Sequence, residues 1–224
     1  MKLFPVVEAF RSIQGEGPFS GYPAFFLRVK ECNYEGKCPV GCDTYPRIKN
    51  MEETFIPYDT VLVKARKTNR VVITGGEPTL YRAKVTDLIT YLDQNGWRGL
   101  AIEVETNGYL LPSLLSYLPC LNVVELYVNW SPKEYDYEKF QDTWRKCDWS
   151  KVTNYCIKVV VWDSVKVRFF VGDLVKNGFG PKLWLMPRGR TKEEMDENWP
   201  VTVELAMEYN VKVTGRLQIE TGIL

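Results

Sequence analysis

Short apolar runs alternate along this chain with longer segments in which apolar residues recur every three or four positions. The runs predict strands at 24–30, 70–78, 100–108, 122–133, 155–162 and 182–190, and a last strand at 211–224. The longer segments predict helices at 81–96, 110–118, 164–178 and 201–210. In the first of them Val85, Leu88, Ile89 and Leu92 share one face, and Gly96 is a suitable C-cap.

This alternation of strand and helix predicts a parallel sheet with right-handed crossovers. About six βα units are present, fewer than the eight of a complete barrel. We therefore expect an α/β fold in which residues 1–224 form one domain, an incomplete and open (β/α) barrel. Polar clusters follow several strands, and the carboxyl edge of a parallel sheet is where such proteins place their sites.

Composition narrows the classes of function. The net charge of +1 gives no global field that would attract nucleic acid or an anionic membrane. No apolar run has the length of a membrane span and the N-terminus has no signal-peptide pattern, so we expect a cytoplasmic protein. The chain has no histidine, which excludes Cys/His zinc sites, Ser-His-Asp triads and imidazole bases.

The stretch "ECNYEGKCPVGCDT" brings Cys32, Cys38 and Cys42 within eleven residues. In a reducing compartment such a cluster indicates metal or redox chemistry more often than structural disulfides. One interpretation is zinc, with Cys120, Cys147 or Cys156 as the fourth ligand, although free cysteines in or beside helices and strands are usually buried as small apolar residues. The other is an iron–sulfur cluster with one open iron, which the spacing favours without excluding zinc.

Four more short motifs lie at predicted strand ends. In "TGGEP", Gly75 and Gly76 fit either a tight turn or a close approach of backbone to ligand, with Glu77 as a charged anchor. In "EVETNG", Glu103 and Glu105 share one strand face, where they are either solvated or contact a ligand. "SPK" and "SIQGEG" by themselves indicate only loops.

The combination is more specific than its parts. A "GGEP" turn one strand after a three-cysteine loop resembles the radical S-adenosylmethionine superfamily. Within it, "SIQGEGPFSGYPAFFLRVKECN", "CDT", "TGGEPTL", "ETNG", "SPK" and "RLQIETGIL" together resemble the 7-carboxy-7-deazaguanine synthase family. The likeness extends from Ser12 to Leu224, but the middle third matches only at strand ends.

The resemblance implies a radical S-adenosylmethionine core in which Cys32, Cys38 and Cys42 bind a [4Fe-4S] cluster. The open iron would chelate S-adenosylmethionine, and reductive cleavage would give a 5′-deoxyadenosyl radical, so no catalytic side chain beyond cluster and cofactor is implied. The matching cofactor-binding residues are Gly76, Glu77, Ser131, Pro132, Lys133, Met186, Pro187, Arg188 and Gly189.

The implied reaction converts 6-carboxy-5,6,7,8-tetrahydropterin to 7-carboxy-7-deazaguanine with loss of ammonia, a carbon–nitrogen lyase step of 7-deazapurine (queuosine-type) biosynthesis. Arg28 suits the substrate carboxylate, because a guanidinium pairs with a carboxylate through two hydrogen bonds. Without the resemblance, Arg28 would be interpreted as a surface strand residue. The matching substrate-binding residues are Ile13, Gln14, Gly15, Glu16, Arg28, Thr74, Gln218 and Leu224.

The resemblance also implies Mg²⁺ bound by Thr44, a homodimer, and an external electron donor such as flavodoxin. Neither a nucleic-acid nor a membrane partner is expected.

Three departures from the family pattern stand out. The spacing is Cys-x5-Cys-x3-Cys, with one extra residue within 39–41, where Gly41 could absorb a bulge. The family's C-terminal histidine is absent, so either Gln218 or Glu220 replaces it or the contact is missing, and Trp130 is larger than the usual residue before "SPK". Two alternatives stay open: a radical-activase relative that makes a glycyl radical on a protein partner, and a non-catalytic zinc-binding module.

Overall fold

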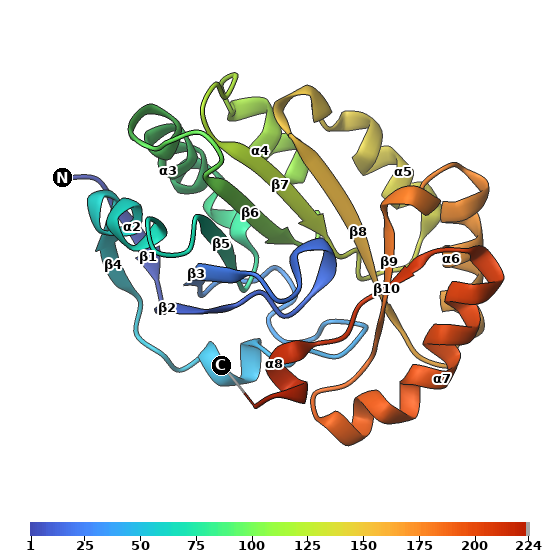
Figure 1. The fold of residues 1–224 in the computed structure, drawn as a ribbon. Helices are drawn as coiled ribbons and strands as arrows, with labels where there is room; N and C mark the ends of the chain where they lie inside the picture. The colour runs from blue at the N-terminus through green and yellow to red at the C-terminus, as the bar shows by residue number, and fades with distance from the viewer. Residues whose placement is uncertain (223–224) are drawn as a thin grey trace.

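A large, curved sheet carries helices on its outer side (Figure 1). The computed structural model describes residues 1–222. The sheet has eight strands in the order β10-β9-β8-β7-β6-β5-β3-β2. All neighbours from β3 to β10 are parallel, and β2 joins β3 antiparallel. The strands are β2 Glu8–Ile13, β3 Pro23–Val29, β5 Arg70–Gly75, β6 Ala101–Thr106, β7 Glu125–Trp130, β8 Asn154–Val161, β9 Leu183–Pro187 and β10 Lys212–Val213.

A small second sheet pairs β1 (Leu3–Val6) with β4 (Thr54–Pro57) in antiparallel fashion beside the N-terminal end of the chain. The helices are α1 Tyr45–Ile48, α2 Tyr58–Ala65, α3 Arg82–Asn95, α4 Leu111–Tyr117, α5 Tyr137–Lys146, α6 Val165–Lys176, α7 Lys192–Tyr209 and α8 Leu217–Glu220. Four 3₁₀ turns, η1 Gly17–Phe19, η2 Pro78–Tyr81, η3 Trp149–Lys151 and η4 Gly180–Lys182, complete the described elements.

The six internal strands and the helices near 81–96, 110–118 and 164–178 are confirmed. The prediction of a long last strand at 211–224 is wrong, because β10 is only Lys212–Val213 and the chain then turns into α8. The last long helix begins nine residues earlier than predicted, since Thr191 caps it through a hydrogen bond from the backbone N–H of Glu194, 3.2 Å from the Thr191 hydroxyl. It continues through Pro200.

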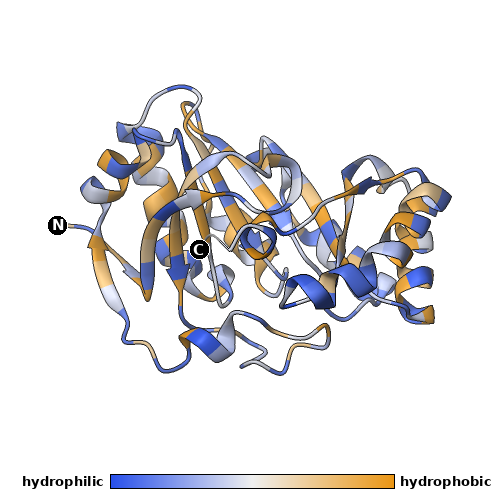
Figure 2. Ribbon diagram, turned by 60° about the horizontal axis from the view of Figure 1, so that its bottom comes forward, coloured by the Kyte–Doolittle hydropathy of each residue, from blue (hydrophilic) through white to orange (hydrophobic). Residues whose placement is uncertain are grey.

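The two faces of the sheet differ in chemistry because side chains alternate along a strand. On β5, Val71 and Ile73 belong to the main core under the helices, whereas Val72 faces inward. On β6, Ile102 and Val104 join that core, and the alternating residues Glu103 and Glu105 face inward with polar partners. Figure 2 shows the apolar positions along the strands and on one side of the helices. The interior of the open barrel is therefore polar along β6, whereas Val72 joins a small apolar cluster with Ala24 and Phe26.

The barrel is open between β2 and β10, which are the two edges of the described sheet and do not pair with each other. The segment after β10 crosses this gap. The backbone N–H of Leu217 donates to the carbonyl of Gly15 at 3.0 Å, and the N–H of Gly17 donates to the hydroxyl of Thr214 at 2.8 Å. The two edges are thus tied at one end without a shared strand ladder.

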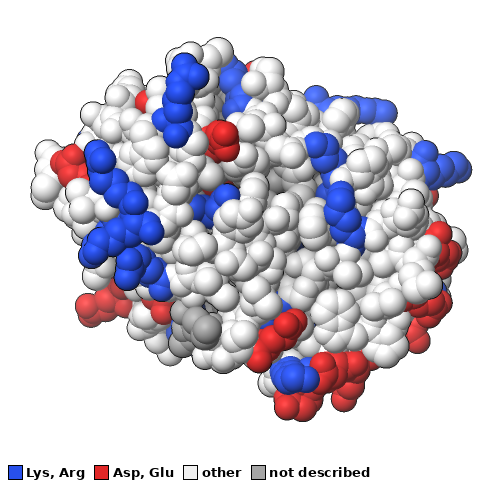
Figure 3. Space-filling model, in the orientation of Figure 1, with Lys and Arg blue, Asp and Glu red and all other residues white. Residues whose placement is uncertain are grey.

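Charged side chains of both signs are scattered over the face shown in Figure 3, with basic groups toward the left edge and acidic groups at the lower right. This mixture agrees with a net charge of +1. Among residues 1–222, no helix combines the length and apolarity that a bilayer crossing requires.

Candidate active site

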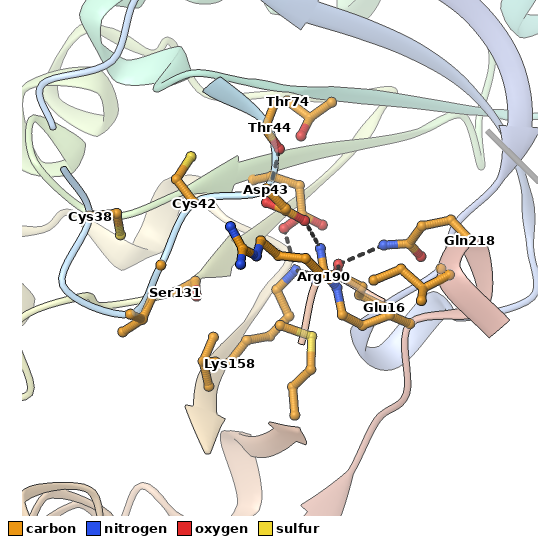
Figure 4. Close-up of a pocket in the computed structure, with 18 of the residues that line it drawn as sticks. Glu16, Cys38, Cys42, Asp43, Thr44, Thr74, Ser131, Lys158, Arg190 and Gln218 are labelled. Carbon is orange, nitrogen blue, oxygen red and sulfur yellow. Dashed lines mark hydrogen bonds and ion pairs between the residues drawn. The ribbon is translucent and has the colours of Figure 1, made fainter. Parts of the chain in front are cut away.

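A cavity of about 910 Å³ opens at the carboxyl edge of the parallel sheet. The loops that follow β3, β5, β6, β7 and β9 form its walls, together with the loop after β2 and the C-terminal segment. Figure 4 shows Cys38 and Cys42 toward one end of the view and Gln218 toward the other. The polar clusters predicted at strand ends therefore meet in one place.

The three clustered cysteines all line this cavity, are half-buried and form no disulfide. The backbone N–H of Tyr45 at the start of α1 donates to Cys42 Sγ at 3.3 Å. Burial raises the pKa of the Cys32 and Cys38 thiols. Within residues 1–222 no three Cys, Asp or Glu side chains are grouped tightly enough to ligate a single ion. A multi-iron cluster is larger than one ion, so its thiolates need not converge on a point.

A turn absorbs the extra residue of the cysteine loop. The N–H of Gly41 donates to the carbonyl of Cys38 at 2.9 Å, and Gly41 has φ of +83°, a left-handed conformation that favours glycine. Val40 is buried between them. The longer second gap is therefore closed into a compact turn before Cys42.

The glycines of "TGGEP" serve close backbone packing. A Cβ on Gly76 would lie 2.1 Å from the carbonyl oxygen of Glu31, and one on Gly75 would lie 2.3 Å from that of Val29. Gly75 also has φ of +116°. The turn after β5 thus lies directly against the backbone that leads into the cysteine loop, with Gly76 still lining the cavity.

Glu77 is almost fully buried, and its carboxylate accepts four hydrogen bonds. The donors are the N–H and hydroxyl of Thr79, the hydroxyl of Thr106 and the N–H of Asn107. Burial raises the pKa of this carboxyl in spite of those donors. Glu77 therefore connects the ends of β5 and β6, and its backbone N–H donates to the carbonyl of Glu31 at 2.7 Å, which ties the same turn to the cysteine loop.

The "SPK" turn follows β7, with Lys133 Nζ 2.7 Å from Ser131 Oγ. Trp130, the residue before it, points to the helix side of the sheet. Its ring stacks on Phe140 at 4.4 Å between centroids, and its Nε1 donates to the carbonyl of Asn107 at 3.0 Å. The larger side chain therefore fills the core and leaves the cavity unchanged.

A buried lysine lies at the base of the cavity. Lys158 of β8 contacts Glu16 at 3.0 Å and also pairs with Glu105 of β6. Burial lowers the pKa of Lys158, but attraction to Glu105 and Glu16 outweighs burial and the pKa is raised. Burial raises the pKa of Glu105, and the attraction of Lys158 only partly opposes it. The ammonium is thus held in place between two inward-facing carboxylates.

Arg216 connects four segments around the cavity mouth. Its Nε is 3.0 Å from Glu16 Oε1, its Nη1 donates to the carbonyl of Gly189 at 2.6 Å, and its Nη2 pairs with Asp43. Burial lowers the pKa of Arg216, but attraction to Glu16 and Asp43 raises it overall. The C-terminal segment is thereby fixed to the loops after β2 and β9 and to the cysteine loop.

Arg28, the predicted carboxylate anchor, is mostly buried, which contradicts its interpretation as a surface strand residue. Its Nε lies 2.6 Å from Glu8 Oε2. Arg47 binds the same carboxylate with both terminal nitrogens. Burial and the nearby charge of Arg47 lower the pKa of Arg28.

Of the two expected replacements for a C-terminal histidine, Gln218 lines the cavity and Glu220 is exposed. Gln218 Nε2 donates to Glu16 Oε1 at 2.9 Å. Its Oε1 is buried and has no hydrogen-bond partner within residues 1–222. A Cβ on Gly15 would lie 1.6 Å from that oxygen, so the glycine makes room for the amide.

Nearly all residues expected at the site line this one cavity. Pro132 is buried but does not line it, and Leu224 lies outside the described residues. Of the other three cysteines, Cys147 and Cys156 are buried as expected, whereas Cys120 is exposed beside Lys151. That expectation was wrong for Cys120 because the segment after α4 runs over the surface.

Several charged residues in or beside the cavity were not predicted from the sequence, and four of them make the ion pairs described above: Lys158, Arg216, Arg47 and Glu8. A signal existed for Lys158, because it is the one charge within the apolar run 155–162. The other three belong to a loop, a short helix and an edge strand, where charged residues are ordinary.

Comparison with known proteins confirms the resemblance. No protein-family model matches the chain. Curated relatives named "7-carboxy-7-deazaguanine synthase" include one from Hyperthermus butylicus, 38% identical over 115 residues, and one from Haemophilus influenzae, 34% identical over 116 residues. These alignments cover 47% and 51% of this chain and 43% and 51% of the relatives, so the matched part spans about half of their length. One from Halobacterium salinarum is 27% identical over 235 residues, covering 96% of this chain and 89% of the relative.

The fold is shared with a solved structure, "Crystal structure of QueE from Escherichia coli". The TM-score is 0.62 at 22% identity, and the alignment covers 95% of this chain and 93% of that one. The match confirms the mostly parallel, open α/β architecture over nearly the whole chain.

Proposed function

We propose that this protein is a radical S-adenosylmethionine lyase that converts 6-carboxy-5,6,7,8-tetrahydropterin to 7-carboxy-7-deazaguanine with loss of ammonia. One observation carries the proposal. Three free cysteines, the "TGGEP" backbone, the "SPK" turn and the loop 186–189 line a single cavity at the carboxyl edge of the sheet. The curated relatives bear the name of that activity.

The donor set suits a [4Fe-4S] cluster held by Cys32, Cys38 and Cys42. Three thiols without a nearby fourth cysteine leave one coordination position for another ligand, and the Tyr45 N–H already donates to one sulfur. When bound, such a cluster supplies the electron that cleaves S-adenosylmethionine and so provides the radical for hydrogen abstraction. The residues that would hold S-adenosylmethionine are Gly76, Glu77, Ser131, Pro132, Lys133, Met186, Pro187, Arg188 and Gly189. Of these, Pro132 would act through backbone geometry, because its ring does not line the cavity.

The remaining cavity wall suits a pterin. A pterin ring presents several N–H donors at its edge, and Gln218, which lines the cavity, carries an amide oxygen that has no hydrogen-bond partner within residues 1–222. Arg28 offers terminal nitrogens to the carboxylate, and Ile13, Gln14, Gly15, Glu16 and Thr74 line the same wall. The C-terminal segment narrows access, which helps to exclude water from a reactive intermediate.

Thr44 is the proposed Mg²⁺ ligand. It lines the cavity, and its hydroxyl donates to Asp43 Oδ1 at 3.2 Å, so oxygen ligands for a hard cation are at hand. Substrate oxygens and water would complete the shell. The homodimer and the flavodoxin-type electron donor stay predictions.

Two alternatives are less well supported. A glycyl-radical activase must admit a segment of protein partner, whereas here the C-terminal segment crosses the barrel gap. A zinc-binding module needs ligands that converge on one ion, and no such group lies within residues 1–222.

Anaerobic reconstitution with iron and sulfide tests this class. We expect about four iron per chain, a brown protein, and 5′-deoxyadenosine after addition of reductant and S-adenosylmethionine. A colourless protein that retains stoichiometric zinc would contradict the proposal.

A further inference from the structure

Two arginines from distant segments share one carboxylate at the edge of the cavity. Arg28 comes from β3 and Arg47 from α1, and both line the cavity. Glu8 of β2 accepts from Arg28 Nε at 2.6 Å and from Arg47 Nη2 at 2.8 Å through Oε2, and from Arg47 Nη1 at 3.1 Å through Oε1. Glu8 therefore holds the two guanidinium groups next to each other.

The charges in this corner do not cancel. Two guanidinium groups face one Glu8 carboxylate, which leaves one positive charge. Asp43, another carboxylate whose charge acts on Arg28, is held by Arg216. The terminal nitrogens of Arg28 donate to no residue within 1–222. The guanidinium carbon Cζ of Arg28 lies 5.6 Å from the centroid of the Phe10 ring. The corner thus presents free N–H donors and a net positive charge to the cavity.

Arg47 is placed by the same loop that carries the cysteines. It lies in the first turn after Thr44, where its backbone N–H donates to the Thr44 carbonyl at 3.0 Å. Its side chain reaches back across the cavity edge to Glu8 and is about two-fifths exposed. Rotation of this exposed guanidinium toward a ligand needs no change in the backbone.

We propose that Arg47 is a second anchor for the substrate carboxylate, positioned beside Arg28 by their shared partner Glu8. The inference rests on the proposed function, because it assumes a carboxylated pterin. A carboxylate entering this corner meets two guanidinium groups whose charge is only half neutralised, and two N–H forks select a planar anion over a neutral group. Arg47 is therefore a determinant of specificity for the carboxylate and does not take part in the chemistry.

The test compares two ligands that differ only in that group. Anaerobic calorimetry on the reconstituted protein with S-adenosylmethionine measures Kd for 6-carboxy-5,6,7,8-tetrahydropterin and for 5,6,7,8-tetrahydropterin, which lacks the carboxylate. Arg47→Ala should weaken binding of the carboxylated ligand about tenfold and leave the other within about twofold. Arg47→Lys keeps the charge without the fork and should fall between wild type and Arg47→Ala.

The matched control is Arg98→Ala, at an exposed arginine outside the cavity, which should bind both ligands as wild type does. Equal weakening of both ligands by Arg47→Ala, or no weakening of either, overturns the inference. Should Arg47→Ala fail to fold, the ratio of the two affinities in Arg47→Lys decides instead. A wild-type protein with no preference for the carboxylated ligand would overturn the proposed function, and the inference with it.

Discussion

Arg216 donates to the carboxylate of Asp43 across 173 positions of the sequence, and so joins the C-terminal segment to the cysteine loop. The same guanidinium binds Glu16. The cavity therefore has its walls fixed by one side chain that comes from outside every strand of the barrel.

Replacing Arg216 with alanine should lower the free energy of unfolding by about 2 kcal/mol, because the mostly buried Glu16 carboxylate keeps only Lys158 as a cationic partner and the partly exposed Asp43 loses its ion pair. Urea denaturation of the variant and of wild type measures this difference in the free energy of unfolding. Arg168→Ala is the matched control, since it removes the more exposed pair with Glu204 and should cost at most about 1 kcal/mol. Equal costs for both variants would show that Arg216 does not connect the loops energetically.

The cysteines should divide into two classes. Cys38→Ser is expected to abolish a four-iron cluster, measured by iron content and by absorption in the thiolate-to-iron region, because among residues 1–222 only three thiols line the cavity. Cys120→Ser, at an exposed cysteine, should retain full iron content. Loss of iron in Cys120→Ser would place the fourth thiol in the site and favour a closed structural centre.

Gly76→Ala tests the close approach of the two loops. The new Cβ would lie 2.1 Å from the Glu31 carbonyl oxygen, a backbone atom that cannot move aside cheaply, so we expect a loss of about 2 kcal/mol or more. Gly180→Ala is the matched control, since its nearest heavy atom is 3.9 Å away. Thermal unfolding of both variants measures the difference, and equal midpoints would mean that the turn has room to relax.

The acid side of the stability curve should depend on Glu16. Burial raises the pKa of this carboxyl, but Lys158 and Arg216 outweigh burial and lower it below its ordinary value of 4.5. A lowered pKa stabilises the fold above about pH 4.5, and that stabilisation is lost as the pH falls toward the lowered value. Glu16→Gln should therefore flatten the fall of the unfolding free energy between roughly pH 5 and pH 3.

Denaturant unfolding at several pH values measures this slope. Glu52→Gln is the control, because it alters an exposed carboxylate outside the ion pairs. Identical slopes for wild type and Glu16→Gln would show that protonation of Glu16 does not contribute to the loss of stability at low pH.

The spacing of apolar residues was sufficient to predict the parallel strands and most helices, because that spacing shows which face of each element is buried. It failed at 211–224, where alternating residues resemble a strand. There the pairing of Leu217 with Gly15 and the fork of Arg216 turn the chain away from β9 after two residues. Such contacts join positions far apart in sequence and leave no local signature.

The residues of the site likewise fall into those that the sequence predicted and those that it did not. Glycines and cysteines were found because their chemistry restricts what else can occupy the position. For Gly76 the folded chain adds a second requirement, because a Cβ at this position would collide with the backbone of Glu31. Glu8 and Arg47 were not predicted because their importance comes from their ion pairs. Glu8 pairs with both Arg28 and Arg47, and only the folded chain brings these three residues together at the edge of the cavity.

A product assay tests the proposed reaction most directly. Reconstituted protein is incubated anaerobically with reductant, Mg²⁺, S-adenosylmethionine and 6-carboxy-5,6,7,8-tetrahydropterin, and the products are separated by liquid chromatography and identified by mass. Wild type should form 7-carboxy-7-deazaguanine, and Cys38→Ser should not. Formation of 5′-deoxyadenosine without that product would contradict the proposed substrate, and formation of neither would contradict the radical chemistry itself.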